Sequence, residues 1–298
     1  MNTDFIRGII PPIITPVDEN ENIDEAKLAR QVNFIIEGGC HGILVFGSNS
    51  EFYMLDDLEL EQGLKIALKA VNGRVPVYFG IGAVRTRKCV KLAQMALANG
   101  AAAVSVLTPM FLRPTPRELY EHFRTIANSL QKAPMLLYSN PGRVGYGVPV
   151  DLVVKLVQDC ENIVGIKDSS GDMTTTAELI RSFRGTNFKI LGGKDTLIYG
   201  TLSHGGHGAI ATTANIFPEL VCSIYEKYMS GDVAGSLEAQ YRLNPVRLAM
   251  DKASFPVATK DLANLSGLDV GEPYRPSLSS EPDVREALKT AARAAGLL

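Results

Sequence analysis

Short apolar segments recur along the first 230 residues, and each is followed by a longer stretch whose apolar residues have helical spacing. We expect strands at Ile9–Thr15, Gly42–Phe46, Val75–Phe79, Ala102–Leu107, Met135–Tyr138, Ile163–Ile166, Lys189–Leu191 and Gly208–Ala211. Strands that alternate with helices pair in parallel through right-handed crossovers. The pattern therefore predicts an α/β fold, and the count of eight favours a (β/α)₈ TIM barrel over an open doubly wound sheet.

The strand pattern stops near residue 231, and the remaining chain has only helical spacing. We expect three helices there, at Val233–Met250, Phe255–Ser266 and Asp283–Ala295. They predict a C-terminal three-helix extension rather than an independent domain. The expected organisation is a catalytic barrel at 1–230 and a helical extension of the same domain at 231–298. Earlier in the chain, Asp24 is the expected N-cap of a helix at Glu25–Glu37.

Composition excludes several functional classes. The 298 residues are 46% hydrophobic with a net charge of −2, which gives no reason to expect a nucleic-acid partner. No apolar run approaches the roughly 20 residues of a membrane span, and the N-terminus lacks the pattern of a signal peptide. The four cysteines form no Cys-x-x-Cys pair, so we expect buried free thiols in a cytoplasmic protein with no membrane partner.

Reactive side chains stand at the ends of three expected strands. Ser48 and Asn49 follow the second strand, Tyr138 ends the fifth and Lys167 ends the sixth. In a barrel the carboxyl ends of all strands meet at one rim, where active sites lie. The sequence therefore predicts that these four residues share one site.

Lys167 is the strongest of these candidates. A buried ammonium needs either a counter-ion or a lowered pKa. An amine that attacks a ketone at neutral pH needs a pKa near 7–8. Lys167 therefore has the character of a Schiff-base nucleophile. A structural lysine that pairs with Asp168 or extends to solvent is an equally good interpretation of this feature alone.

Tyr138 and the Ser48-Asn49 turn strengthen the catalytic interpretation. Imine formation needs a group that gives and takes protons, and a phenol one strand away from the amine can do so. Turns with free backbone N–H groups and small hydroxyls bind carboxylates. Each feature has a plainer alternative, because a tyrosine often caps a core and such turns are common.

Four segments resemble the pyruvate-dependent class I aldolase superfamily that includes dihydrodipicolinate synthase and N-acetylneuraminate lyase. They are Gly47-Ser48-Asn49-Ser50-Glu51, Tyr138-Ser139-Asn140-Pro141, Gly165-Ile166-Lys167-Asp168 and the eighth-strand segment Gly205–Ile210. The resemblance covers nearly the whole chain. It implies a lysine–pyruvate imine at Lys167, a proton shuttle at Tyr138 and a carboxylate pocket at Ser48 and Asn49. It also implies Ile210 in the substrate pocket and a homotetramer built as a dimer of dimers.

The resemblance leaves the second substrate open. Phe111 stands where the synthases have a tyrosine from the neighbouring subunit, and a phenyl ring cannot relay a proton. Arg143 matches the arginine that holds the aldehyde's carboxylate in those synthases. Lys194 favours an acidic substrate if it faces the site, although a solvated surface lysine is as good an interpretation. The Ser48-Asn49 turn, together with Leu137-Tyr138-Ser139 and Lys167-Asp168-Ser169, looks closer to the matching segments of 4-hydroxy-2-oxoglutarate aldolases.

We therefore expect an aldolase that uses pyruvate or another 2-oxo acid plus an aldehyde, and cleaves or forms a 4-hydroxy-2-oxo acid or a 2-keto-3-deoxy sugar acid. The alternatives are 4-hydroxy-tetrahydrodipicolinate synthase, a Schiff-base dehydratase of 2-oxo-3-deoxy acids, and a weakly active protein that senses a 2-oxo acid. The four histidines have no metal-ligand spacing, and Gly80–Arg85 does not complete a dinucleotide fingerprint. We expect no metal and no cofactor.

Overall fold

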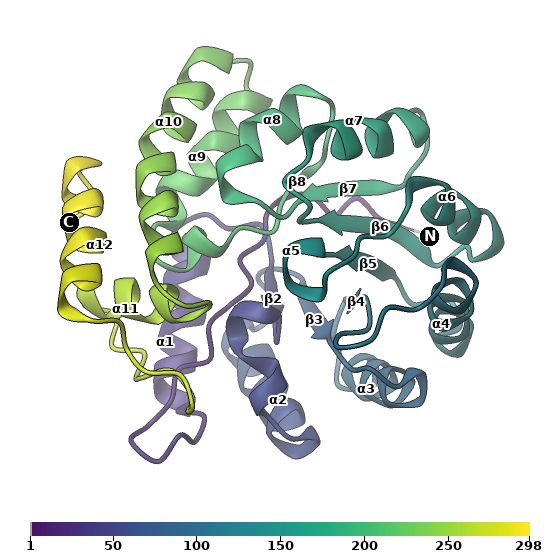
Figure 1. Ribbon diagram of the computed structural model, residues 1–298, viewed down its shortest axis with the longest axis horizontal. Coiled ribbons are helices and arrows are strands. Elements are labelled where there is room, and N and C mark those ends of the chain that lie inside the picture. The colour runs from purple at the N-terminus through teal and green to yellow at the C-terminus, as the bar shows by residue number, and fades with distance from the viewer. Residues whose placement is uncertain (1) are drawn as a thin grey trace.

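Eight parallel strands form one sheet in the computed structural model, which describes residues 2–298 (Figure 1). They are β1 (Gly8–Ile9), β2 (Ile43–Val45), β3 (Val77–Ile81), β4 (Ala103–Leu107), β5 (Met135–Ser139), β6 (Ile163–Asp168), β7 (Lys189–Gly192) and β8 (Gly208–Ala209). The spatial order is β1-β8-β7-β6-β5-β4-β3-β2, so β1 pairs with β8 and every other strand pairs with its neighbours in sequence. The prediction of eight parallel strands is confirmed.

The two ends of this curled sheet meet beside Leu44. The Leu44 N–H donates to the Pro11 carbonyl at 2.9 Å, and the Ile13 N–H donates to the Leu44 carbonyl at 2.9 Å. The segment that follows β1 therefore lies alongside β2. Prolines 11 and 12 have no N–H to donate, so this segment makes only an isolated parallel bridge. The predicted strand at Ile9–Thr15 was wrong in extent for this reason.

Other strand ends differ from the predictions by one or two residues, and two of these differences bear on the expected site. β8 stops at Ala209 instead of Ala211, because the chain turns into the short 3₁₀ helix Thr212–Asn215. β6 continues through Asp168, two residues beyond the expected end. Lys167 thus lies inside the hydrogen-bonded part of the sheet and its backbone is fixed on both sides by β5 and β7.

Nine helices connect the strands and surround the sheet in Figure 1. They are α1 (Glu25–Glu37), α2 (Asp57–Val71), α3 (Thr86–Ala98), α4 (Pro116–Ser129), α5 (Pro141–Val144), α6 (Val150–Asp159), α7 (Met173–Ser182), α8 (Ile198–Ser203) and α9 (Pro218–Met229). The Asp24 side chain accepts a hydrogen bond from the Lys27 N–H, which confirms the predicted N-cap of α1. The start and end of α1 are also as predicted.

Three further helices follow the last strand and gather on one side of the molecule (Figure 1). They are α10 (Val233–Ala249), α11 (Val257–Leu265) and α12 (Pro282–Ala294). Their bounds lie within two residues of the predicted ones. α11 begins later than expected because Pro256 disfavours a helical backbone at Phe255, the residue before it. Within residues 2–298 no strand follows β8.

The core has two parts. One cluster takes apolar side chains from or beside each of the eight strands and fills the space inside the curled sheet; its members are Ile6, Ile10, Leu44, Tyr78, Ala103, Leu136, Val164, Leu191 and Ile210. A larger cluster packs the outer face of the strands against the helices. All four cysteines are buried and free, as predicted. The interior cluster blocks the sheet's inside, which leaves the strand ends as the place for a site.

Candidate functional site

Lys167 and Tyr138 lie side by side on adjacent strands. The two residues are directly paired in the β5–β6 register, so their side chains leave the sheet on the same face. The Lys167 Nζ lies 4.2 Å from the centroid of the Tyr138 ring. Only 4% of Lys167 and 6% of Tyr138 is exposed. An amine and a phenol therefore share one desolvated environment near the carboxyl ends of the strands.

Polar side chains surround the Tyr138 hydroxyl. The Asn140 side-chain amide donates to it at 2.8 Å, and the Ser48 Oγ lies 3.5 Å away. Burial raises the pKa of Tyr138, but the Lys167 charge and hydrogen bonds from Ser48, Asn140 and Ser169 together bring that pKa below its ordinary value. A phenol in this setting gives up its proton more readily than a free tyrosine. Asn140 belongs to the Tyr138–Pro141 motif, but its type and spacing alone do not indicate this role.

Asp168 does not pair with Lys167. Its carboxylate accepts hydrogen bonds from the Ser170 N–H and hydroxyl, both at 3.0 Å, and from the Thr176 hydroxyl at 2.6 Å. Adjacent residues of a strand point to opposite faces, so Lys167 and Asp168 diverge. Within residues 2–298, no carboxylate oxygen lies within 4 Å of the Lys167 Nζ. The structural alternative, a lysine neutralised by its neighbour, is therefore wrong.

The turn after β2 brings Ser48 and Asn49 to the same rim in different orientations. Both residues belong to the short 3₁₀ helix Ser48–Ser50 and are buried. Ser48 faces the Tyr138 hydroxyl. The Asn49 amide instead donates to the Thr212 hydroxyl, and the Thr259 hydroxyl donates to the Asn49 Oδ1 at 3.4 Å. Ser48 thus joins Lys167 and Tyr138, whereas the Asn49 side chain is turned toward the segment after β8.

A buried ion pair between Glu51 and Lys260 holds the turn at Ser48–Ser50 in place. Glu51 has a left-handed backbone with φ 54°, and its carboxylate lies 2.9 Å from the Lys260 Nζ of α11. The two side chains are 1% and 2% exposed. Glu51 also accepts a hydrogen bond from the Tyr274 N–H at 3.0 Å, and Lys260 donates to the Glu272 carbonyl at 2.9 Å. The C-terminal helices are thereby tied to the residues next to Ser48.

A cavity of about 420 Å³ adjoins the turn. Its lining comes from the segments that follow β2, β5 and β8, and from the end of α10 through the start of α11. Asn49, Arg143, Thr212, Arg247 and Thr259 are among the residues that line it. Arg143 lies on α5, and its guanidinium stacks on the Phe255 ring with 3.9 Å between the Cζ and the ring centroid. Sequence reasoning found Asn49 and Arg143 but missed Thr212, Arg247 and Thr259.

The remaining predicted site residues lie elsewhere. Ile210 is packed in the interior cluster and is 1% exposed. Lys194 is half-buried, and its side chain packs over Gly171 in the loop after β6. Phe111 is fully exposed, with a left-handed φ of 71°. Among the described residues that line the cavity beside Asn49, none of these three is present.

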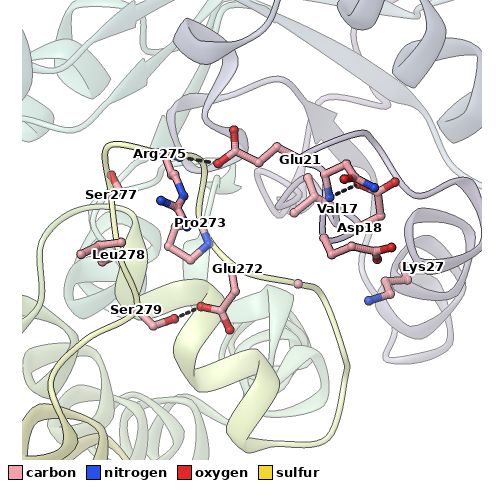
Figure 2. Close-up of a pocket in the computed structure, with 13 residues that line it drawn as sticks. Val17, Asp18, Glu21, Lys27, Glu272, Pro273, Arg275, Ser277, Leu278 and Ser279 are labelled. Atoms are coloured by element: carbon pink, nitrogen blue, oxygen red, sulfur yellow. Dashed lines mark hydrogen bonds between the residues drawn. The ribbon is translucent and has the colours of Figure 1, made fainter.

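A second cavity, of about 860 Å³, lies away from these residues (Figure 2). It separates the loop at Val17–Glu21 from the C-terminal segment at Gly271–Ser279. The Arg275 N–H donates to Glu21, and the Ser279 hydroxyl donates to Glu272, so the polar groups drawn in Figure 2 largely satisfy one another. Among the residues that line this cavity, none belongs to the predicted site.

Among residues 2–298, no three His, Cys, Asp or Glu side chains converge in a way that could hold a metal ion. None of the helices in the same range has the length and apolar character needed to cross a bilayer.

The chain matches the model of the dihydrodipicolinate synthetase family over residues 5–295. It is 33% identical to the 4-hydroxy-tetrahydrodipicolinate synthase of Methanopyrus kandleri, over 98% of this chain and 97% of that protein. It is 32% identical to the Rhizobium meliloti enzyme of the same name, over 99% of this chain and 100% of that protein. The dihydrodipicolinate synthase structure from Thermotoga maritima superposes with a TM-score of 0.93 at 28% identity, covering 98% of this chain and 99% of that one.

Proposed function

Because this chain belongs to the dihydrodipicolinate synthetase family, whose members are class I lyases acting through a lysine Schiff base, we propose that Lys167 forms an imine with pyruvate or another 2-oxo acid. The pairing of Lys167 with Tyr138 across β5 and β6 is the observation that carries this proposal. Ser48 and Asn49 bind the 2-oxo acid's carboxylate, Ile210 closes the pocket behind it, and Arg143 binds the acid group of the second substrate.

The proposed reaction starts with attack of the unprotonated Lys167 amine on the ketone carbon. Tyr138 delivers a proton to the carbinolamine oxygen, which leaves as water and produces the imine. In the cleavage direction Tyr138 then removes the proton of the 4-hydroxyl, the C3–C4 bond breaks and its electron pair moves into the imine to form an enamine. The aldehyde leaves, the enamine takes a proton at C3, and hydrolysis of the imine releases pyruvate and Lys167.

We favour cleavage or formation of a 4-hydroxy-2-oxo acid, such as 4-hydroxy-2-oxoglutarate or a 2-keto-3-deoxy sugar acid. Phe111 supports this choice because its ring has no hydroxyl with which to complete a proton relay. The relatives' names favour the alternative, 4-hydroxy-tetrahydrodipicolinate synthase, which condenses pyruvate with aspartate semialdehyde. A dehydratase that expels water from a 2-oxo-3-deoxy acid uses the same imine and is the second alternative.

We further propose a single domain, with a closed (β/α)₈ barrel at 1–230 and a three-helix extension at 231–298. The bonds between Leu44 and the segment after β1 support the closed barrel, and the Glu51–Lys260 pair supports a shared domain. The family resemblance supports a homotetramer, and four free, buried thiols support a cytoplasmic location.

Borohydride trapping tests the central proposal. Incubation with pyruvate and borohydride should attach one pyruvate-derived group to Lys167, because reduction of the imine gives a stable secondary amine. The Lys167→Ala variant should not be labelled and should lose activity, whereas Lys65→Ala, which removes an exposed lysine on α2, should behave like the wild type. Peptide mass spectrometry locates the label. Labelling at another lysine, or an active Lys167→Ala variant, would refute the proposal.

A panel of substrates separates the alternatives. Pyruvate would be offered with candidate aldehydes, aspartate semialdehyde included, and 2-oxo acids would be offered in the cleavage direction. Efficient condensation with aspartate semialdehyde would overturn our preference for the aldolase and leave the imine chemistry intact.

A further inference from the structure

The cavity next to Asn49 carries an excess of positive charge. Among the residues that line it, Arg143 and Arg247 each contribute a guanidinium group, and Asp251 contributes the single carboxylate. The arginines come from α5 and α10, segments far apart in the sequence. An anion placed between them would meet one unbalanced positive charge in a space partly closed to water, where charge–charge attraction is stronger than in bulk solvent.

Most of the hydrogen-bonding capacity of Arg247 is unused by the protein. A guanidinium has five N–H donors in a planar fork. Within the described chain, Arg247 makes one contact from this group, to the Asp251 Oδ1 at 2.7 Å. The Arg247 side chain is 20% exposed, whereas that of Asp251 is 61% exposed. An ion pair with so exposed a carboxylate adds little to stability, so a bound anion can replace it at small cost.

The same cavity adjoins the turn that carries Ser48. Asn49 lines it and is the neighbour of Ser48, whose hydroxyl lies 3.5 Å from that of Tyr138. Thr212 and Thr259 hold the Asn49 side chain and line the cavity as well. A substrate bound with one end at Ser48 can therefore extend past Asn49 toward α10.

We propose that Arg247 is a specificity-determining residue that, together with Arg143, binds the second carboxylate of a dicarboxylic 4-hydroxy-2-oxo acid. This inference rests on the proposed function and deepens it by naming the substrate class. The planar fork of Arg247 matches the two oxygens of a carboxylate, and the substrate's carboxylate takes the place of Asp251 on it. A neutral polyol chain cannot balance the charge of the two arginines, so the cavity discriminates against sugar acids of that kind.

Paired substrates test this assignment. Cleavage of 4-hydroxy-2-oxoglutarate would be compared with that of 4-hydroxy-2-oxopentanoate, which has a methyl group in place of the second carboxylate. In Arg247→Met, kcat/KM for the dicarboxylate should fall on the order of 10- to 100-fold, mainly through KM, because a charge-assisted hydrogen-bonded pair is lost. The value for the monocarboxylate should stay within about threefold. Arg247→Lys should recover only part of the loss.

Two controls guard the interpretation. Arg293→Met, on α12, removes the same charge from an exposed site that does not line the cavity, and should leave the discrimination between the substrates unchanged. Unchanged trapping of pyruvate by Arg247→Met shows that the variant folds and forms the imine. An equal loss for both substrates, or no loss for either, would overturn the assignment.

A binding measurement keeps this inference separate from the proposed function. If the wild type forms no imine with pyruvate, the proposed chemistry fails, and thermal denaturation with glutarate, an unreactive dicarboxylate, becomes the test. Glutarate should raise the Tm of the wild type more than butyrate does, and Arg247→Met should abolish the difference. The assignment is refuted if the variant keeps the full glutarate shift.

Discussion

At the scale of single residues, the pairing of Glu51 with Lys260 shows how a charge outside the chemistry supports the site. Burying two charges is unfavourable unless they are paired and hydrogen-bonded, and here both conditions hold. Glu51 follows Ser48–Ser50 directly and has a left-handed backbone, so its carboxylate fixes a turn that would otherwise be strained. The ion pair therefore links the C-terminal helices to the turn that contains Ser48 and Asn49.

Removing one partner of this pair should be strongly destabilising. Lys260→Met leaves the Glu51 carboxylate buried without its cation, and we expect a loss of about 3–5 kcal/mol in the free energy of unfolding, measured by urea denaturation. The double variant Glu51→Gln with Lys260→Met removes both charges and keeps an acceptor for the Tyr274 N–H, so it should be more stable than the single variant. A loss below about 1 kcal/mol in Lys260→Met would contradict this account.

At the scale of elements, β6 is the strand that positions Lys167, the proposed nucleophile. It is one of the longest strands in the described chain, and it pairs with β5 and β7 through Lys167. Gly165 stands two residues before Lys167, on the same face. A Cβ added there would lie 2.6 Å from the Lys189 carbonyl oxygen of β7 and 2.7 Å from the Leu136 Cδ2 of β5. The close packing of three strands therefore requires glycine at this position.

Gly165→Ala should disturb the site as well as the sheet. Overpacking of this kind costs about 1–3 kcal/mol, and the displaced strand should slow imine formation because Lys167 moves with it. Borohydride trapping rates and urea denaturation would report the two effects. Gly200→Ala in α8, where the added Cβ meets only the Met173 side chain at ordinary contact distances, serves as the matched control and should change neither. A Gly165→Ala variant with wild-type trapping rates would show that β6 tolerates the shift.

At the scale of the whole molecule, Phe111 is the feature that the isolated protomer does not explain. A bulky residue with a left-handed backbone is energetically unfavourable, and this ring is fully exposed in addition. Burial of the ring against a second copy of the chain would offset the cost of the left-handed backbone and remove the ring from water, in keeping with the proposed homotetramer.

Phe111→Asn should weaken self-association without harming the protomer. Asparagine tolerates a left-handed backbone, so the variant removes the ring and relieves the strain. Sedimentation at micromolar concentration should show a smaller assembly than the wild type. Leu58→Asn, which removes another exposed apolar side chain on α2, should keep the wild-type mass. The same mass for Phe111→Asn and wild type would show that the ring makes no contact needed for assembly.

The sequence by itself determined which strand ends meet at one rim. The alternation of apolar segments and helices predicted eight parallel strands, and parallel strands bring their carboxyl ends to one rim. Lys167, Tyr138 and Ser48 could be assigned to a common rim because each stands at a strand end. The structure places Lys167 against the Tyr138 ring and Ser48 near its hydroxyl. Strand bounds next to prolines and turns were less predictable, because local hydrogen bonding decides them.

Only the tertiary structure decided what surrounds that centre. The partners of Asn49, the cavity that contains Arg247 and the pairing of Glu51 with Lys260 all join segments that are distant in the chain. Such contacts cannot be predicted from periodic patterns in the sequence. Local propensity and hydrophobic spacing do not encode which helix covers which strand end. Lys167 could therefore be found from its position on a strand, whereas Arg247 on an ordinary helix became a candidate only once α10 was seen to close the cavity.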